Sequence, residues 1–282
     1  MVGSNNTKSS RRLRLSIRYA LASALLLVMV YPYLYMVLNS FADWNQVDRK
    51  LLPDSFTLKS YTWLLNGGET GVTRPWINAF ANSVIVSVAS TALMMLFGVM
   101  VAYALSKLRF RGRDTINNFI LFHMFFPGII LLIPSFLIIQ RIGWYDTYWA
   151  LIIPKGVSLW AIFMYTNFFR AIPDTFIEAA KLDGARDFQI LYRIMLPMSK
   201  SITSVIFLFT LMERWTELLW DMIMVRSDHM LTLNVLLSQM FGPYGGYPGP
   251  LYAGSVLLSL PIIVLFIIFG KKFQEGMQFT LK

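Results

Sequence analysis

The sequence contains no cysteine, and this absence excludes several kinds of chemistry at once. Disulfide bonds, thiolate ligands for zinc and a cysteine nucleophile are all ruled out. Charged residues are also scarce, at 14% of 282 residues, whereas 56% of the residues are hydrophobic. Because a soluble domain of this size does not need so much apolar surface, we expect most of the chain to lie in a lipid bilayer.

Two kinds of catalytic motif are missing as well. The sequence has no Gly-rich loop ending in Lys followed by Ser or Thr, so we do not expect this chain to bind or hydrolyse ATP itself. It has no His-Glu-x-x-His motif or comparable nucleophile–base set, which argues against a membrane-embedded enzyme. His123 and His229 have no second metal ligand at helical spacing, which favours packed side chains over a metal site.

The charge that is present is mainly basic, with a net value of +10. Lys and Arg cluster in short segments beside apolar stretches, a pattern typical of membrane orientation rather than of nucleic-acid binding. The first, third and fifth polar segments and the C-terminus are expected to be cytoplasmic, because the opposite loops hold fewer Lys and Arg or offset them with Asp and Glu. Their basic residues are Arg11, Arg12 and Arg14; Lys107, Arg109, Arg111 and Arg113; Arg170, Lys181, Arg186, Arg193 and Lys200; and Lys271 and Lys272.

Six apolar stretches are long enough to cross the bilayer as helices, and lipid leaves the backbone no other way to satisfy its hydrogen bonds. They are residues 17–41, 79–105, 115–139, 148–169, 201–224 and 251–270. The sequence therefore predicts an all-α membrane protein with six transmembrane helices. Gly98, Pro127, Gly128 and Pro134 are expected to be kinks or close-packing points.

The predicted organisation follows from these stretches. The first apolar run has no small-residue cleavage site and is expected to be an uncleaved anchor. We expect a cytoplasmic segment, a first transmembrane helix, a periplasmic loop, a core of five helices with a cytoplasmic loop, and a cytoplasmic tail. These are residues 1–16, 17–41, 42–77, 78–270 with the loop at 170–200, and 271–282.

The loop within the core has the signals of two short helices. Asp174 is a good N-cap, and Gly184 is the residue type that tolerates a left-handed turn at a helix C-terminus. Phe188, Leu191, Tyr192 and Met195 then recur at helical spacing and predict one apolar face, and Pro197 is expected to end the second helix. We call residues 174–197 the knob. The pattern alone fits docking into a groove of another protein and lying on lipid headgroups equally well.

A second group of residues places charge at membrane depth. Glu213, Glu217 and Asp221 are four apart and would line one face of a continuous fifth helix. Arg214 is adjacent, and Lys155 is near the outer end of the fourth helix. One interpretation is a substrate path, with Trp215, Trp220 and the charged groups contacting sugars. The alternative is internal pairing of Arg214 or Lys155 with Glu217, which the rarity of unpaired charge in membranes favours.

The knob resembles a known family. Glu178-Ala179-Ala180, then Asp183-Gly184-Ala185 and Leu196-Pro197, are similar to the signature of permease subunits of ABC importers. Further stretches resemble the maltose-type carbohydrate branch, and the resemblance runs from about residue 78 to residue 270. These stretches are Ala102–Leu105, Phe110–Arg113, Ile142–Tyr148, Trp215–Trp220 and Leu231–Val235. The resemblance implies that Glu178, Ala179, Ala180, Asp183, Gly184, Ala185 and Pro197 form coupling helices in a cleft of an ATP-hydrolysing subunit.

The resemblance also implies the assembly. The expected partners are a second, homologous permease, a dimer of ATPase subunits that holds ATP and magnesium, a periplasmic or tethered solute-binding protein, and a carbohydrate. No cofactor is expected in this chain, and the expected location is the bacterial inner membrane. The C-terminal tail lacks the family's usual Gly-rich ending, so a contact of the tail with the ATPase is not expected.

Some residues depart from the family pattern. Thr216 stands where Asn is usual, and Asp221 where Pro is common. Lys155 and Arg214 are unusual, and if both faced the path unpaired they would favour an acidic oligosaccharide of the alginate or pectin kind. The alternative function is a cation-coupled secondary transporter that uses Glu213, Glu217 and Asp221 as a relay.

Overall fold

A computed structural model describes residues 4–66, 75–240 and 248–280, and the side chains of residues 14–66, 75–240 and 248–270. The described residues form helices and no β-strand beyond one isolated bridge between Ala42 and Phe56. This confirms the all-α prediction. The longer helices are α1 (Ser4–Ser40), α2 (Lys59–Asn66), α3 (Trp76–Lys107), α4 (Arg113–Met124), α5 (Leu132–Arg141), α7 (Leu159–Ala171), α8 (Thr175–Leu182), α11 (Lys200–Trp215) and α14 (Pro248–Thr280).

The chain divides into two compact units, and the division falls within α14. The first unit comprises residues 1–74 and 240–257. In it, Asp48 adopts a left-handed backbone with φ 60° and its carboxylate accepts the hydroxyl groups of Tyr35 at 3.0 Å and Tyr252 at 2.5 Å. These bonds fasten the loop after α1 to two helices of the same unit.

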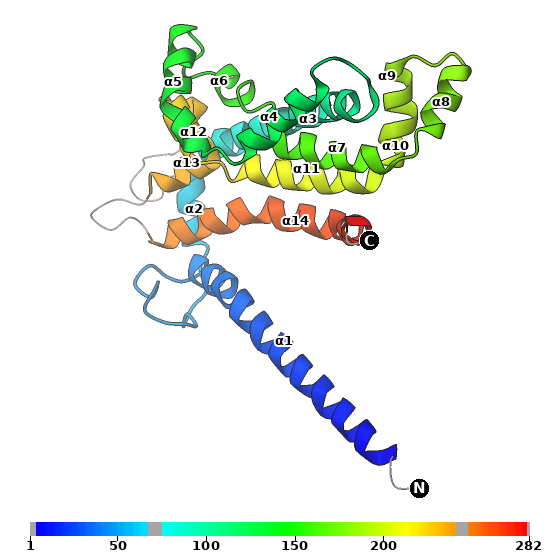
Figure 1. Ribbon diagram of the computed structural model, residues 1–282. Helices are drawn as coiled ribbons and strands as arrows, with labels where there is room; N and C mark the ends of the chain where they lie inside the picture. The colour runs from blue at the N-terminus through cyan, green and yellow to red at the C-terminus, as the bar shows by residue number, and fades with distance from the viewer. Residues whose placement is uncertain (1–3, 67–74, 241–247, 281–282) are drawn as a thin grey trace. The chain divides into compact units, whose positions relative to one another are not determined.

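The second unit comprises residues 75–239 and 258–282 and is organised around α3. This 32-residue helix has no internal proline and packs along α7 and α11 (Figure 1). A Cβ atom added at Gly98 would lie 3.5 Å from Ala161 Cβ and 3.5 Å from the Tyr165 ring. Gly98 is therefore a close-packing point between α3 and α7, and α3 continues through it without a break.

Three of the predicted spans are interrupted. Helix α4 is separated by a break at residues 125–127 from the 3-10 turn η2 (Gly128–Leu131), which leads into α5, and the two segments are bent by 96°. The span predicted at 148–169 is split into α6 (Tyr148–Ile152) and α7, and the span at 201–224 into α11 and α12 (Leu219–Met224). The kink expected at Pro127 and Gly128 is observed as the first break. Pro154 and Gly156 lie in the second break, whereas the third, at residues 216–218, contains neither glycine nor proline.

By length and composition, three described helices are able to cross a membrane: Arg14–Ser40, Trp76–Lys107 and Pro248–Gly270. Two bent pairs bring the number to five if each pair is one span. The second of these pairs joins Asp187–Met198 to Lys200–Trp215 at 86°. The structure therefore supports three to five apolar spans.

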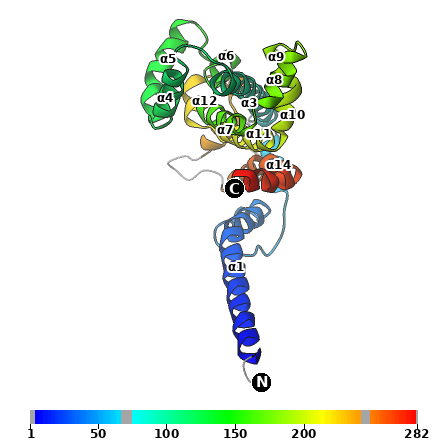
Figure 2. The same cartoon turned by 45° about the vertical axis from the view of Figure 1, so that its right-hand side comes forward.

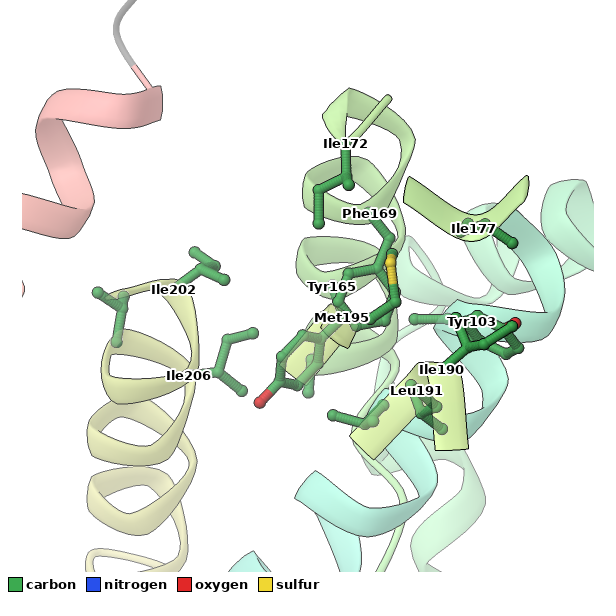
Figure 3. Packing of buried hydrophobic residues seen from close by; sticks show 14 of the residues in the cluster. Tyr103, Tyr165, Phe169, Ile172, Ile177, Ile190, Leu191, Met195, Ile202 and Ile206 are labelled. Atoms are coloured by element: carbon green, nitrogen blue, oxygen red, sulfur yellow. The ribbon is translucent and has the colours of Figure 1, made fainter. Parts of the chain in front are cut away.

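The core of the second unit includes one cluster of buried residues where α3, α7 and α11 meet the knob. Figure 3 shows Tyr103 of α3 and Phe169 of α7 gathered with Ile177 of α8 and with Ile190 and Leu191. Tyr165, Phe169, Ile190 and Met195 have no or almost no exposed surface. Burying side chains of this size stabilises the arrangement by about 1.5–3 kcal/mol each. The knob is therefore packed into the core and is not a loosely attached loop.

Candidate functional site

The first helix of the knob is α8, and it ends as the sequence predicts. Gly184 has φ +80°, the left-handed conformation that glycine adopts without a steric cost. The N–H of Ala185 donates to Ala180 O at 2.9 Å, and the N–H of Gly184 donates to Lys181 O at 3.0 Å. These two bonds form a Schellman motif, which satisfies carbonyls that the helix end leaves free.

The start of α8 differs from the prediction. Asp174 occupies the N-cap position, but its side chain makes no capping hydrogen bond. Instead Lys107 Nζ, at the end of α3, donates to Asp174 Oδ1 at 2.6 Å. This bond and the lysine's charge hold the pKa of Asp174 below its usual range. The cap was predicted from local sequence, whereas the observed partner is distant in sequence.

The second helix of the knob runs through α9 (Asp187–Ile190), the π-helical turn η3 (Leu191–Met195) and α10 (Leu196–Met198). Pro197 does not end this helix, which turns at Ser199 instead. Ser199 is fully buried, and its hydroxyl donates to Met195 O at 2.5 Å. A wider π turn before the proline is one way in which a helix accommodates the missing N–H.

The apolar face predicted on the second helix divides into two. Leu191 and Met195 are buried in the core, whereas Phe188 and Tyr192 are exposed and stack on each other with ring centroids 6.4 Å apart. The two alanines of α8 divide in the same way: Ala180 is buried and Ala179 is exposed. One alanine of the pair therefore packs in the core, and the other lies on the surface.

The exposed side of the knob carries several large apolar side chains among charged ones. Leu182 is 90% exposed, Phe188 63% and Phe176 47%. Glu178, Asp183, Gly184 and Pro197 lie on the surface as well, and Ala185 is half-buried. Figures 1 and 2 show α8, α9 and α10 together at one end of the helices α3, α7 and α11. Large apolar side chains with this degree of exposure mark a contact surface.

A cavity of about 390 Å³ lies where the three helix breaks meet. We call it the break pocket. It is lined by Gly128, Ile129, Leu131, Leu132, Ser135, Pro154, Lys155, Glu217, Leu219 and Trp220. These residues come from the three breaks, between α4 and α5, α6 and α7, and α11 and α12, and from the first turns of α5 and α12. Non-helical backbone at membrane depth is tolerated where it is buried in protein or lines a water-filled cavity.

Three of the predicted path residues come together in the break pocket. Lys155 Nζ donates to Glu217 Oε2 at 3.0 Å and lies 4.9 Å from the centroid of the Trp220 ring. Glu217 Oε1 accepts the backbone N–H of Trp220 at 3.3 Å. Both charged side chains keep part of their surface exposed, 33% for Lys155 and 21% for Glu217. The pairing of Lys155 with Glu217 expected as the alternative is thus observed, and the pair is accessible.

The backbone at the break between α11 and α12 is satisfied from another segment. Asn234 Nδ2 donates to Thr216 O at 2.8 Å and to Glu217 O at 3.3 Å. These carbonyls would otherwise lack partners because the helix stops. The break interrupts the face that Glu213, Glu217 and Asp221 would share on a continuous helix, so that prediction is wrong.

Arg214 does not reach the break pocket. It is 2% exposed, and its guanidinium donates to Asp221 Oδ1 at 2.7 Å and to Leu151 O at 3.1 Å. Its partner is therefore Asp221 and not Glu217. Since Lys155 and Arg214 are both paired, the premise that they face the path as free charges is wrong.

The remaining predicted path residues lie around this arrangement. Trp215 is buried, packs edge-to-face on Phe80, and donates its indole N–H to Leu258 O at 2.9 Å. Glu213 is exposed on α11. His123 contacts the rings of Phe119 and Phe126, and in the described part of the chain no three metal-binding side chains lie together.

Comparison with known proteins identifies similar sequences and folds. The family model described as "Binding-protein-dependent transport system inner membrane component" matches residues 94–278. The chain is 33% identical over 257 residues to the inner membrane ABC transporter permease protein YcjP of Escherichia coli (strain K12), covering 89% of this chain and 90% of that protein. It is 31% identical over 255 residues to the arabinooligosaccharides transport system permease protein AraQ of Halalkalibacterium halodurans, covering 89% and 90%.

A solved structure is also similar. It is a chain in the crystal structure of a bacterial ABC transporter involved in the import of the acidic polysaccharide alginate. The TM-score is 0.82 at 26% sequence identity, and the match covers 94% of this chain and 98% of that chain.

Proposed function

The chain belongs to the family of binding-protein-dependent transport system inner membrane components, and from this membership we propose that it is the permease subunit of an ATP-driven importer of oligosaccharides. The observation that carries the proposal is the knob, a compact element built into the core whose exposed side carries the large apolar side chains Phe176, Leu182 and Phe188. The chain itself is not an enzyme. The comparisons lend no support to a cation-coupled secondary transporter.

The proposed assembly contains a second, homologous permease, a dimer of ATPase subunits and a solute-binding protein. ATP and magnesium are bound by the ATPase subunits, and this chain binds no cofactor. The name of the family, which refers to a binding protein, supports the last partner. The chain crosses the bacterial inner membrane several times, and six crossings with both termini in the cytoplasm fit the distribution of Lys and Arg.

In this topology residues 1–16 and 271–282 are cytoplasmic, 17–41 is the first span, 42–77 is periplasmic, and 78–270 is the permease core. The knob is then on the cytoplasmic side. The ATPase contacts the surface residues of the knob, which are Phe176, Glu178, Ala179, Leu182, Asp183, Gly184 and Pro197. Ala180 and Ala185 hold α8 on the core. Closure of the ATPase dimer moves the knob and rocks the spans between inward- and outward-facing arrangements.

The substrate path passes the break pocket. Lys155, Glu217 and Trp220 line it, and Glu213 on α11 adds a further exposed carboxylate. Carboxylate and ammonium groups hydrogen-bond sugar hydroxyls, and an indole ring supplies an apolar platform. Arg214 and Trp215, which are buried, support this wall from behind.

We further propose that the substrates include acidic oligosaccharides. The likeness to the alginate importer chain supports this class. In the break pocket Lys155 is held by Glu217, so a uronic acid carboxylate competes with Glu217 for the same ammonium group. During such an exchange Lys155 always has an anionic partner, and Glu217 keeps the hydrogen bond from the N–H of Trp220. This matters because an unpaired charge at membrane depth is costly.

The test is uptake by the assembled transporter. The chain would be co-expressed with its neighbouring permease and ATPase, reconstituted in liposomes, and supplied with binding protein and labelled oligosaccharides. We expect uptake that requires ATP and persists with an ionophore. Glu178→Lys, which reverses a charge on the exposed face of α8, should abolish uptake while Glu178→Gln retains most of it. Uptake that collapses with the ionophore and needs no ATP would contradict the proposal.

A further inference from the structure

One end of α3 holds both helices of the knob by polar contacts. Lys107 Nζ donates to Ile172 O and to Asp174 Oδ1, each at 2.6 Å, at the entrance of α8. Tyr103 OH, one helical turn earlier, donates to Asp187 Oδ1 at 3.0 Å, at the entrance of α9. The Lys107 side chain is only 4% exposed, so it contacts the protein and hardly any solvent.

The same two turns of α3 also hold the knob by packing. Val99, Ala102 and Tyr103 belong to the buried cluster that contains Ile177 of α8 and Leu191 of the second helix. Hydrogen bonds to charged partners at buried sites are directional, whereas apolar contacts are not. Together they fix both the position and the orientation of the knob relative to α3.

The opposite end of α3 makes a matching set of contacts. Asn82 Nδ2 donates to His229 O at 2.8 Å and to Leu231 O at 2.9 Å, and Ser83 Oγ accepts the N–H of Leu233 at 2.7 Å. Tyr148 OH donates to Asn82 Oδ1 at 2.5 Å. This end of α3 therefore holds the start of α6 and the segment between α12 and the next helix, α13 (Leu233–Ser238).

Those segments are in turn joined to each other. Asp146 Oδ1 accepts the N–H groups of Arg226 at 2.9 Å and Ser227 at 3.1 Å, and the N–H of Asp146 donates to Met224 O at 3.0 Å. Burial alone would raise the pKa of Asp146, but these N–H groups more than offset it and the pKa is lowered. The turn before α6 and the segment after α12 are thus bonded to each other, and α12 itself carries Leu219 and Trp220 of the break pocket.

Between its two ends α3 is the unbroken helix of this unit's core. Asn82 and Lys107 are roughly 38 Å apart at the helical rise of about 1.5 Å per residue. The spans formed by α4 with α5, α6 with α7, and α11 with α12 are each interrupted. An interrupted span absorbs a displacement at its break, whereas a continuous, buried helix transmits it.

We infer that α3 is the rigid link that carries movement of the knob to the segments around the break pocket, with Lys107 and Tyr103 as positioning residues at one end and Asn82 at the other. The inference rests on the proposed function, because it requires that the knob is the part that the ATPase moves. It adds that displacement reaches the far end through one helix and not through the broken spans.

The first test measures coupling in the reconstituted transporter. In Lys107→Met/Tyr103→Phe we expect the ATP hydrolysed per sugar imported to rise by roughly tenfold, as expected for losing hydrogen bonds to charged partners. Asn82→Leu should raise the same ratio through the other end. Lys107→Arg keeps a cationic donor and should restore most of the coupling. Ser106→Ala is the matched control on α3, because the Ser106 hydroxyl donates mainly to Ala102 O of its own helix.

The second test measures rigidity directly, and the absence of cysteine allows labels to be placed without removing native thiols. Spin labels at Arg193→Cys in the knob and Arg226→Cys at the far end would report one distance in the nucleotide-free and ATP-trapped states. We expect the same distance in both states of the otherwise unchanged chain, and a broadened distribution in Lys107→Met/Tyr103→Phe.

Different results would contradict the proposed function and the role of α3. If the unsubstituted chain supports no ATP-driven uptake, the proposed function is wrong. If it does, but the double variant keeps the original ratio of ATP to sugar, or the label distance changes between the two states, α3 is not the link. A variant complex that fails to assemble is replaced by Lys107→Gln alone, whose ratio is judged in the same way.

Discussion

The knob and the break pocket use charge in opposite ways. In the knob, apolar side chains form the core, Asp174 and Asp187 take their bonds at its edge, and the outer surface is free to contact a partner. In the break pocket the charges of Lys155 and Glu217 line a cavity and neutralise each other. Under the proposed function, the difference teaches that a rigid contact element is built from packing, whereas a site on the path of a polar substrate needs charges that can exchange partners.

The largest expected effect concerns the wall behind the break pocket. Asp221→Leu leaves Arg214 buried without its carboxylate, and breaking a buried ion pair costs about 3–5 kcal/mol. We expect the purified protein to show a much lower midpoint of thermal unfolding. The double variant Arg214→Met/Asp221→Leu should recover most of the loss. A single variant as stable as the unsubstituted chain would show that this wall does not depend on its ion pair.

The next effect concerns the knob. Gly184→Pro cannot adopt φ +80° and loses the N–H that donates to Lys181 O, so the Schellman motif is broken. We expect near-complete loss of ATP-driven uptake with normal amounts of protein in the membrane. Gly184→Ala has room for its methyl group and strains the backbone by only about 1 kcal/mol, so it should retain partial uptake. Equal uptake by the two variants would argue against a requirement for this turn.

A smaller effect should distinguish the two regions by substrate. Lys155→Gln removes the cation of the break pocket and is expected to lower uptake of a uronic acid oligosaccharide about tenfold relative to a neutral one, as for loss of one charge-assisted hydrogen bond. Glu217→Gln frees Lys155 and should shift the preference the other way. The measurement is competition between the two sugars in one uptake assay. Equal changes in the uptake of both sugars would show that Lys155 does not determine the specificity of transport.

The smallest effect is the response of the knob to acid. Because the folded-state pKa of Asp174 is lowered by Lys107, its contribution to stability is present above the ordinary aspartate pKa of about 3.9 and is lost as the pH falls through the lower, folded-state value. The range from pH 6 to 8 lies roughly two units or more above the ordinary aspartate pKa. Asp174 should therefore not change the hydrogen exchange of the α8 amides within that range. In Lys107→Met any loss of protection should begin at higher pH than in the unsubstituted chain. Identical pH profiles would show that the bond does not stabilise α8.

The sequence predicted the knob better than the break pocket for a physical reason. The turn at Gly184 depends on a left-handed residue and bonds within six residues, so local sequence is sufficient. Local sequence also predicted that Asp174 would cap α8, and this failed because Lys107, far away in the chain, competes for the carboxylate. Periodicity likewise placed Phe188 and Leu191 on one face, whereas packing against α3 and α7 buries only Leu191.

The break pocket depends on segments that only folding brings together. Pairing of Lys155 with Glu217 was foreseen as an alternative because buried charges need partners. The pairing of Arg214 with Asp221 was missed because residues seven apart on a continuous helix lie about 10 Å apart along its axis. The break at Thr216 removes that separation. No glycine or proline lies in this break, so the local sequence does not predict it. Its signal is Asn234, whose amide replaces the missing helical donors.

The right-angle corner at Ser199 has a mechanical consequence. The second helix of the knob and α11 meet there at 86° with one buried residue between them. Two helices fixed at a right angle move together, so a displacement along the axis of one helix rotates the other sideways. Under the proposed function, movement of the knob therefore tilts α11, and the break after Trp215 takes up this tilt before it reaches Glu217. The corner sets the direction of that motion, and a flexible loop in its place would transmit none of it.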